Sequence, residues 1–507
     1  MSDHKRIAKN TIFLYIRMLL LMLVSLYTSR VVLAVLGVED YGIYNVVGGI
    51  VVLFTFINNS MVTSTQRYLN YELGRDDSLQ AQRVFSISLN IHVLIALLIF
   101  LLSETVGLWL LNTTIKYPES RAFAVQVIYQ LSILTTCARI VRAPYHAAII
   151  AHERMSFYAY LSIFEAGLQL GVVFLLKAFD FDRLILYGAL LCLVTIITNV
   201  CYYLYCRKSF VICKYRLYND KSLYRQLLSF SGWSLFGGVA NMGASQGLNM
   251  LLNVFFGVTI NAAMGIANQV NSAVSSFVHN FQTAFNPQIV KSYAVGDISG
   301  FINLILSTSK YSFILLFIIA LPIYICCPEV LSVWLTEVPE GAVSFCRLML
   351  IFSLLDALQG PLWFSVQATG KIRTYQILMS FMILSNLPIA YLCLKQGLSP
   401  NSALVVRCCV NLATLFVRLW YLRRLFGFPV GDFFKNVVSR IVVIVLVAYF
   451  SVHIPSGDVE PIVKILVVTL ETLFVNGLLI ATIGLDKKEK QVIVNNVRKF
   501  YEKYKRG

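Results

Sequence analysis

The stretches APYHAAIIAHERMSFY (Ala143–Tyr158) and GPLWFSVQATGKIRTY (Gly360–Tyr375) share one pattern of residues. Four positions match at a constant offset of 217 residues without a gap, namely Pro144, Ala151, Arg154 and Tyr158 with Pro361, Ala368, Lys371 and Tyr375. Repeated matches at one offset indicate an internal duplication. We therefore predict that the chain contains two structural repeats.

Shorter matches support the duplication on both sides of this segment. They are GIYN at Gly42–Asn45 with GIAN at Gly265–Asn268, Gly74 and Asp76 with Gly296 and Asp297, and Gly37–Val38 with Gly257–Val258. The matches pair helices one to six with helices seven to twelve. Because six is an even number, both repeats enter the membrane from the same side, as parallel repeats related by an axis along the membrane normal.

The composition is that of a polytopic membrane protein. Of the 507 residues 58% are hydrophobic and 13% charged, and the mean hydropathy is +0.73. Apolar runs of 18 or more residues recur, each able to cross about 30 Å of hydrocarbon. We predict an all-α protein of about fourteen transmembrane helices with a MATE-like arrangement. It comprises an N-terminal six-helix lobe (1–225), a C-terminal six-helix lobe (226–424) and a segment of two additional helices with a basic tail (425–507).

The net charge of +17 is distributed unevenly between the two sides. With a cytoplasmic N-terminus, the cytoplasmic side receives 31 Lys and Arg residues and the other side only five. This asymmetry follows the positive-inside rule and predicts that both termini are cytoplasmic. No aromatic-interleaved basic face stands apart from the loops, so we expect no nucleic acid partner. The eleven cysteines lie mostly within helices, which is typical of free thiols.

Three segments resemble a known family. They are NTIFLYIRMLLLMLVSLYTSRVVLAVLGVEDYGIYNVVGG (Asn10–Gly49), the A-x-E-R-M-x2-Y segment that ends at Tyr158, and the stretch from N-Q-V to F-N-P-Q-I (Asn268–Ile289). They look like the Wzx-type polysaccharide flippases of the multidrug/oligosaccharidyl-lipid/polysaccharide exporter superfamily, over essentially the whole chain. The resemblance implies a flippase in the bacterial cytoplasmic (inner) membrane. Its cargo would be an undecaprenyl-pyrophosphate-linked oligosaccharide repeat unit for O-antigen or capsule assembly.

Helix eight is unusually polar for a membrane span. Over Asn261–Pro287, an α-helix at about 100° per residue collects several polar side chains into one stripe. The stripe contains Asn261, Asn268, Ser272, Ser275, His279 and Asn286. We expect this stripe, with Asn268 and His279, to face a cavity. For His279, a hydrogen-bonded buried histidine is the commoner alternative to a role in proton-coupled transport.

Two arginines in helix one, Arg17 and Arg30, are candidates for binding phosphate. A guanidinium binds phosphate oxygens in a bidentate manner and stays charged. Each arginine also lies about six residues from a helix end, where its side chain can reach the interface instead. Both readings stay open. The resemblance carries no catalytic residue onto these positions.

Helix twelve carries Arg407, Asn411, Thr414 and Arg418 on one face. This face either lines a cavity or brings each arginine to its own interface. In helix ten, Asp356 either binds a coupling H⁺ or Na⁺ or forms a structural ion pair. In helix seven, Gln246 and Asn249 share a face that serves either a cavity or interhelical hydrogen bonds, and Gly243-x3-Gly247 permits close helix packing.

Neither a metal-ligand spacing nor a nucleotide-binding motif is evident, so we expect no cofactor, no metal site and no enzymatic activity. The leading hypothesis is translocation of lipid-linked oligosaccharide by alternating access. Expected partners are that lipid, membrane lipids, and the polysaccharide polymerase and glycosyltransferases of the same pathway. A lipid II flippase or drug/cation antiporter is the alternative. A membrane glycosyltransferase or polymerase is less well supported, because all external loops are short.

Overall fold

The protein is all-helical over the part described by a computed structural model. That part comprises residues 13–484 except 25–26, 29–30, 33–34, 38–39, 41–42, 45–46, 48–55, 114–117, 179–180, 336–337 and 453–459. Within it there is no β-strand, and ten helical segments are long and apolar enough to cross a membrane. The prediction of an all-α polytopic membrane protein is confirmed.

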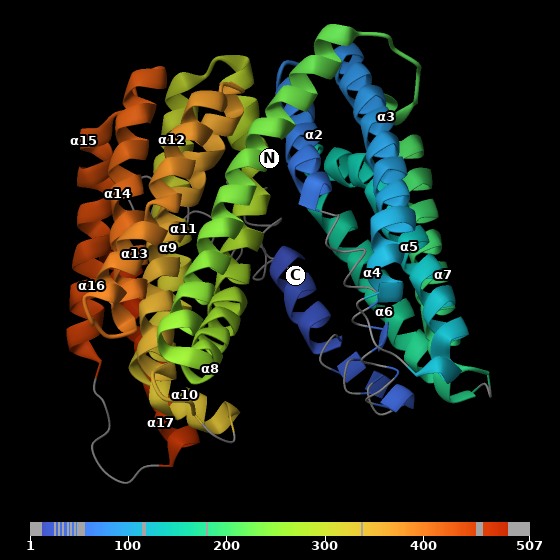
Figure 1. Cartoon of the computed structure of the whole chain (residues 1–507). Coiled ribbons are helices and arrows are strands. Elements are labelled where there is room, and N and C mark those ends of the chain that lie inside the picture. Colours follow the sequence, from blue (N-terminus) through green and yellow to red (C-terminus); the bar gives the residue numbers. More distant parts are fainter. Residues whose placement is uncertain are drawn as a thin grey trace, which may run out of the picture. The chain divides into compact units, whose positions relative to one another are not determined.

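The helices follow one another with short connections (Figure 1). After an apolar helix at Phe13–Val24, they are α2 (Phe56–Gly74), α3 (Ser78–Leu102), α4 (Leu108–Thr113), α5 (Ala122–Ala151), α6 (Met155–Ala178), α7 (Arg183–Ser209), α8 (Lys221–Val295), α9 (Ile298–Ile325), α10 (Cys327–Trp334), α11 (Ala342–Thr369), α12 (Arg373–Leu384), α13 (Asn386–Lys395), α14 (Asn401–Phe426), α15 (Val430–Phe433), α16 (Ser439–Ser451) and α17 (Pro461–Leu479).

The long helix α8 consists of two arms that meet at Gly257. This residue has φ 77° and ψ −163°, so the helical backbone is interrupted there. A side chain would be strained at such a positive φ, and glycine is not. The sequence predicts two membrane helices that meet at this glycine, and the break lies where it is expected.

Left-handed backbone positions recur at the offset of the sequence repeat. Three pairs have positive φ in both copies: Gly37 with Gly257, Asp76 with Gly296, and Glu153 with Gly370. A non-glycine residue at positive φ is uncommon, so its recurrence at matched positions reflects shared backbone geometry. Duplication of the sequence is therefore accompanied by duplication of the turns that end the helices.

The helices around these turns also correspond. α5 and α11 each contain one internal proline, Pro144 and Pro361, at the offset of 217 residues. α6 corresponds to α12 and α13 together, and α7 corresponds to α14. The predicted pair of parallel six-helix repeats is confirmed in this order of elements.

One expected boundary is wrong. The sequence predicts that helix four ends at Val141 and that Arg142 and His146 lie in a loop, but α5 continues to Ala151. Pro144 does not end the helix, because neighbouring helices can satisfy the backbone group that a proline frees. Arg142 and His146 are therefore helical residues within one continuous segment.

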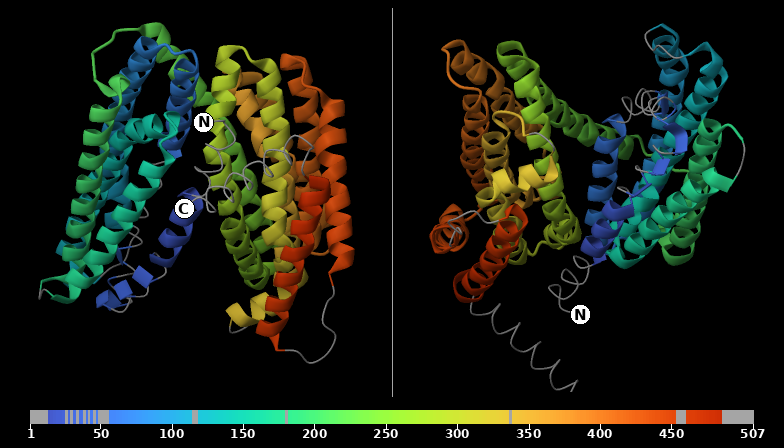
Figure 2. Two further views of the ribbon diagram at one scale, coloured as in Figure 1. Left: turned by 180° about the vertical axis from the view of Figure 1, so that it is seen from behind. Right: turned by 90° about the horizontal axis from the view of Figure 1, so that it is seen from below.

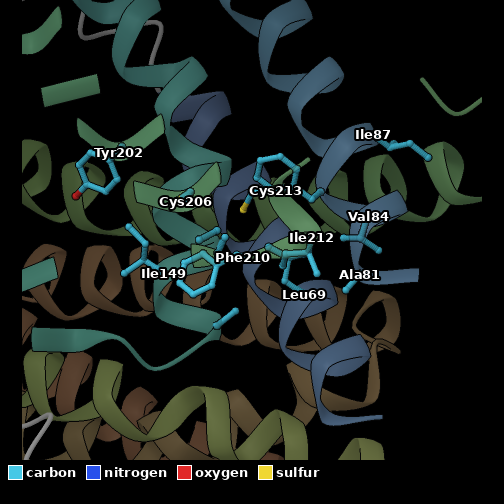
Figure 3. Close-up of a cluster of buried hydrophobic side chains, with 14 of the residues drawn as sticks. Leu69, Ala81, Val84, Ile87, Ile149, Tyr202, Cys206, Phe210, Ile212 and Cys213 are labelled. Atoms are coloured by element: carbon cyan, nitrogen blue, oxygen red, sulfur yellow. The ribbon is translucent and has the colours of Figure 1, made fainter. Parts of the chain in front are cut away.

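The chain divides into two compact units. Unit 1 comprises Met1–Val239, Thr283–Ile298 and Phe364–Ile377. Its helices α3, α5 and α7 lie side by side. The short turn Val211–Cys213 packs against α3 and buries Phe210, Ile212 and Cys213 among side chains of α2, α3, α5 and α7 (Figure 3).

Unit 2 comprises Ala240–Gln282, Ser299–Trp363 and Leu378–Gly507. Its main core gathers residues from both arms of α8 and from α10, α11, α13 and α14. A Cβ atom at Gly247 would lie 2.8 Å from the Cδ atoms of Leu387. The Gly243-x3-Gly247 motif therefore allows α8 to approach α13 closely, as its spacing predicts.

α16 and α17 follow the twelve-helix core and lie side by side (Figure 2). α17 contacts α10, where Lys464 donates a hydrogen bond to Glu329. Burial acts to raise the pKa of Glu329, but the bond and charge of Lys464 outweigh it and lower that pKa. The ion pair helps to attach the additional helices to unit 2. The three-part division at 225 and 424 stays a prediction.

Candidate functional site

A polar cavity of about 410 Å³ lies in unit 2, between the second arm of α8 and α11. α8 contributes Asn271, Ser272, Ser275, Ser276, His279 and Asn280, and α11 contributes Phe352, Ser353 and Asp356. Hydroxyl and amide groups dominate this lining. Such groups donate and accept hydrogen bonds without adding net charge, so the cavity is suited to a polar ligand.

The predicted stripe of helix eight lines this cavity in part. Ser272, Ser275 and His279 lie in the lining, whereas Asn268 lies one turn beyond it and is half-buried. The side chain of Asn261 lies outside the described residues. Asn271, which the stripe does not include, accepts a hydrogen bond from Ser353 of α11. The cavity wall is therefore wider than the stripe that the sequence singles out.

Asp356 is the only carboxylate among the residues that line the cavity. It forms no ion pair or hydrogen bond with another residue in the described part of the chain. Its electrostatic interaction is with Arg407 of α14. The guanidinium of Arg407 stacks over the ring of Phe352 at 4.3 Å, and Nη1 lies 3.9 Å from Sδ of Met349. Asp356 and Arg407 thus share one site without a direct salt bridge.

The other polar residues of helix twelve meet a different side chain. Gln359 of α11, only 1% exposed, donates a hydrogen bond to the carbonyl oxygen of Asn411 at 3.2 Å and accepts one from Thr414 at 3.4 Å. Arg418 donates to the carbonyl oxygen of Gln359 at 2.8 Å. Asn411 and Arg418 therefore join α14 to α11, and their bonds are interhelical.

Replacing Gln359 with Leu is expected to destabilise the fold by about 1–3 kcal/mol, because Asn411 and Thr414 lose a buried partner. Thermal unfolding of the purified protein in detergent, followed by tryptophan fluorescence, measures the loss. Gln396→Leu is the matched control, since Gln396 is exposed at the end of α13. Equal melting temperatures of the two variants would show that the cluster adds nothing to stability.

Two further candidates in helix seven bond to each other. Nδ2 of Asn249 donates a hydrogen bond to Oε1 of Gln246 at 3.4 Å within the first arm of α8. Gln246 is exposed and Asn249 is half-buried, and neither lies in the cavity lining. Arg347, opposite Asp356 on α11, donates to the carbonyl oxygens of Tyr324 and Ile325. Its charge caps the C-terminus of α9, where a cation is favoured.

A second cluster of charges lies in unit 1, around Arg17. The guanidinium of Arg17 lies 4.4 Å from the centroid of the Tyr158 ring. The Tyr158 ring in turn lies 4.8 Å from the ring of His146. Nε of Arg17 is buried and has no hydrogen-bond partner among the described residues. An unpaired buried donor is costly, so this arginine has capacity for a further acceptor.

Arg142 extends the cluster from α5 to α6 and α7. Its guanidinium carbon lies 5.0 Å from the ring centroid of Tyr202, and Nη1 lies 3.4 Å from Oε2 of Glu165. Glu165 is the one carboxylate that the cluster shows among the described residues, against the two guanidinium groups of Arg17 and Arg142. The cluster is therefore a net positive site, made of arginines interleaved with aromatic rings.

Sequence reasoning missed Arg142 and His146 as site residues. They are four residues apart and lie on one face of α5, which is the signal that could have identified them. The expected end of helix four at Val141 placed both in a loop and concealed this spacing. Arg30, the second candidate in helix one, lies outside the described residues.

In the described part of the chain, no group of three or more His, Cys, Asp and Glu side chains is arranged to hold a metal ion. The two sites, in unit 1 and unit 2, consist of hydrogen-bonding and ionic groups. They can bind polar and charged ligands, and they lack an arrangement of nucleophile and base among the residues described above.

Comparison with known proteins yields matches of structure alone. The chain matches neither a protein-family model nor a curated protein. A multidrug resistance MATE family transporter of the MOP superfamily, in an outward-facing conformation, superposes with a TM-score of 0.73 at 14% identity, covering 85% of this chain and 97% of that one.

Two further solved structures are similar to the chain. A MATE protein in the straight conformation gives a TM-score of 0.71 at 15% identity and covers 84% of this chain and 96% of its own. A MOP superfamily transporter from Pyrococcus furiosus, described by a binding pocket of reverse polarity that suggests a different function, gives 0.72 at 13% identity and covers 85% and 97%. At these identities the likeness establishes architecture, and the chain has the fold of the MATE transporters.

Proposed function

We propose that the protein is a transporter that moves undecaprenyl-pyrophosphate-linked oligosaccharide repeat units across the bacterial cytoplasmic membrane by alternating access. The observation that carries this proposal is the net positive cluster of unit 1. Its two arginines, Arg17 and Arg142, face a single carboxylate, Glu165. An arginine within the membrane costs about 2.5–3.5 kcal/mol on insertion scales, which favours a role for it.

The chemistry of a pyrophosphate fits this cluster. Its oxygens accept bidentate hydrogen bonds from guanidinium groups, which remain charged at every physiological pH. The unpaired Nε of Arg17 is a donor available for such an acceptor. Tyr158 keeps the guanidinium in place through a cation–π contact at 4.4 Å, a contact that leaves the edge of the guanidinium free to donate.

The cavity of unit 2 supports the same cargo through a different chemistry. Serine hydroxyls and asparagine amides, with one aromatic ring and one carboxylate, line about 410 Å³. Sugars present many hydroxyl groups, which pair with donors and acceptors of this kind. A polar cargo with a pyrophosphate at one end would therefore find matching groups in both units.

The fold by itself does not select this cargo, because one fold supports many functions. The Pyrococcus furiosus structure is described by a binding pocket of reverse polarity. That description supports reading function from the charge of the site. A drug/cation antiporter has the same fold, and Asp356 in the unit 2 cavity favours it as the second candidate, with H⁺ or Na⁺ as the coupling ion. A lipid II flippase would use the same positive cluster.

Translocation by purified protein in lipid vesicles separates these candidates. Three fluorescent probes are supplied inside separate vesicle preparations: undecaprenyl-pyrophosphate-linked oligosaccharide, lipid II, and an aromatic drug cation. Appearance of each on the outer surface is followed by quenching with dithionite. We expect the oligosaccharide lipid to move at least about tenfold faster than the cation. Preferential movement of lipid II or of the cation would select the corresponding alternative, and formation of longer glycan chains would identify a polymerase.

We further infer that the cargo is supplied by glycosyltransferases on the cytoplasmic side and is used by a polysaccharide polymerase on the opposite side. This order follows from the chemistry, since a repeat unit must be assembled before it is translocated. Deletion of the gene is expected to abolish surface polysaccharide while growth continues. Loss of growth would instead support lipid II export.

A further inference from the structure

Unit 1 contains a buried arginine that the proposed site does not use. Arg67 of α2 is 7% exposed, and its Nε and Nη2 donate hydrogen bonds to the carbonyl oxygens of Gln367 and Ala368 at 3.1 and 2.9 Å. These carbonyls belong to the last turn of α11, which leaves such groups without helical partners. Arg67 therefore caps α11, a helix of the second repeat, from a helix of the first.

The turn after α11 is shaped to admit this arginine. Gly370 has φ 76°, and a Cβ atom there would lie 2.7 Å from Nη2 of Arg67. Any side chain at this position would therefore displace the guanidinium as well as strain the backbone. Tyr68 and Tyr71 flank the same guanidinium, with ring centroids 4.5 and 4.8 Å away.

A reciprocal contact lies at the matched turn of the first repeat. Glu153, at the end of α5, occupies the position of Gly370 at the offset of 217 residues, and its φ is 57°. Its carboxylate, 2% exposed, accepts hydrogen bonds from Nζ of Lys291 at 2.8 Å and from Nε2 of Gln288 at 3.0 Å. Both donors lie in the second arm of α8, in the second repeat.

Two adjacent features support the contact at Glu153. Burial lowers the pKa of His152, with smaller effects from Lys291 and Arg154 in the same direction, so its ring is neutral at pH 7 and adds no charge beside Lys291. α2 and α8 also meet directly, since a Cβ atom at Gly74 would lie 3.0 Å from Cβ of Ala294 and 2.8 Å from Cα of Lys291.

The two contacts are related by the internal repeat. In each, the end of the second helix of one repeat binds the turn after the fourth helix of the other repeat. All the residues involved belong to unit 1. They also lie on the side that carries the basic loops, which the sequence predicts to be cytoplasmic. Because neither repeat can leave the other without breaking both contacts, the two are coupled.

We propose that the Arg67–α11 contact and the Glu153–Lys291 contact form a paired latch that closes the transport path on the cytoplasmic side. The inference rests on the proposed function in that it takes the protein to be a transporter that opens alternately to each side. Opening to the cytoplasm requires both contacts to break together. The released charged groups then gain water, so the latch is reversible.

Accessibility of a buried cysteine tests the latch without any substrate. The five cysteines that are not buried are first replaced by Ser: Cys137, Cys201, Cys393, Cys408 and Cys409. Ala368→Cys then supplies a probe beside Arg67 at a position that is 0% exposed. Arg67→Ala and Glu153→Gln are each expected to speed maleimide labelling of the probe about tenfold, as the loss of a charge-assisted hydrogen bond would.

Ala81→Cys is the matched control, because Ala81 is equally buried in the core of unit 1 but away from the latch. Its labelling is expected to stay slow in both variants. Faster labelling at both positions would indicate general unfolding and overturn the interpretation. Unchanged labelling of Ala368→Cys in both variants would overturn the latch itself.

A cross-link tests the same inference in a chain that keeps both contacts. Gly74→Cys and Ala294→Cys place two sulfur atoms on neighbouring Cβ positions, near the separation of about 3.5–4.5 Å found in disulfides. Oxidation is expected to stop labelling of the Ala368→Cys probe and to stop transport in vesicles, and reductant to restore both. Labelling that continues in the oxidised chain contradicts the latch. Labelling that responds while no oligosaccharide lipid moves in any chain retains the latch and contradicts the proposed cargo.

Discussion

Translocation of the pyrophosphate-linked oligosaccharide is expected to fall about 10- to 100-fold in Arg17→Ala, with no loss of protein in the membrane. The side chain contributes charge-assisted hydrogen bonds to the pyrophosphate, and its Nε has no partner among the described residues that would be lost in the substitution. Arg17→Lys keeps the charge but loses the bidentate geometry, so an intermediate rate is expected. Initial rates in vesicles, normalised to protein abundance, measure both effects.

Specificity for the anion distinguishes this prediction from a structural effect. Arg225→Ala removes the same charge from an exposed position at the start of α8 and is expected to transport normally. A probe that carries a single phosphate in place of the pyrophosphate is expected to depend less on Arg17. If Arg17→Ala moves the pyrophosphate probe as fast as the unmodified chain does, the unit 1 cluster is not the anion site. Its contact with Tyr158 would then be structural.

Asp356→Asn is expected to reduce transport driven by an ion gradient about tenfold and to leave thermal stability equal or higher. A carboxylate without an ion-pair partner at this depth costs about 2.5–3.5 kcal/mol on insertion scales, and the neutral amide avoids that cost. Its retention in the unit 2 cavity therefore favours a function, which we expect to be binding of the coupling H⁺ or Na⁺. Transport rates with and without imposed H⁺ and Na⁺ gradients, together with melting temperatures, provide the measurement.

The control for Asp356 is Asp432→Asn, because Asp432 is exposed in the short helix α15 and lies outside the cavity. Gradient-driven transport is expected to be unchanged in that variant. Full gradient dependence in Asp356→Asn would exclude Asp356 as the coupling group. A fall in melting temperature together with transport would instead indicate that Asp356 has a structural role beside Arg407.

Much of the architecture is predictable from the sequence. The match between Pro144 and Pro361 identifies α5 and α11 as equivalent helices, and the break at Gly257 is predicted from its repeat of Gly37. These predictions succeed because they depend on local requirements, namely the length of a membrane span and the positive φ of a turn. The boundary at Val141 failed because proline is tolerated within a membrane helix whose neighbours compensate for it.

The candidate site is predictable only in part. Asp356 and His279 are expected to face a cavity, and both lie in its lining. Arg407 and Arg418 look equivalent in the sequence, yet Arg418 bonds to the backbone of Gln359 whereas Arg407 stacks on Phe352 beside the cavity. Helical spacing defines a shared face, but it does not specify which neighbouring helix each turn of that face meets.

The sequence by itself determined the helical class, the membrane character and the duplication, since each follows from hydropathy, charge asymmetry and residues repeated at one offset. The tertiary structure decided which charges are paired and which remain available. Glu153 and Lys291 lie 138 positions apart along the chain, and Arg67 lies 301 positions from Ala368. Such contacts depend on the rotation, kinks and packing of whole helices, which no local pattern of residues encodes.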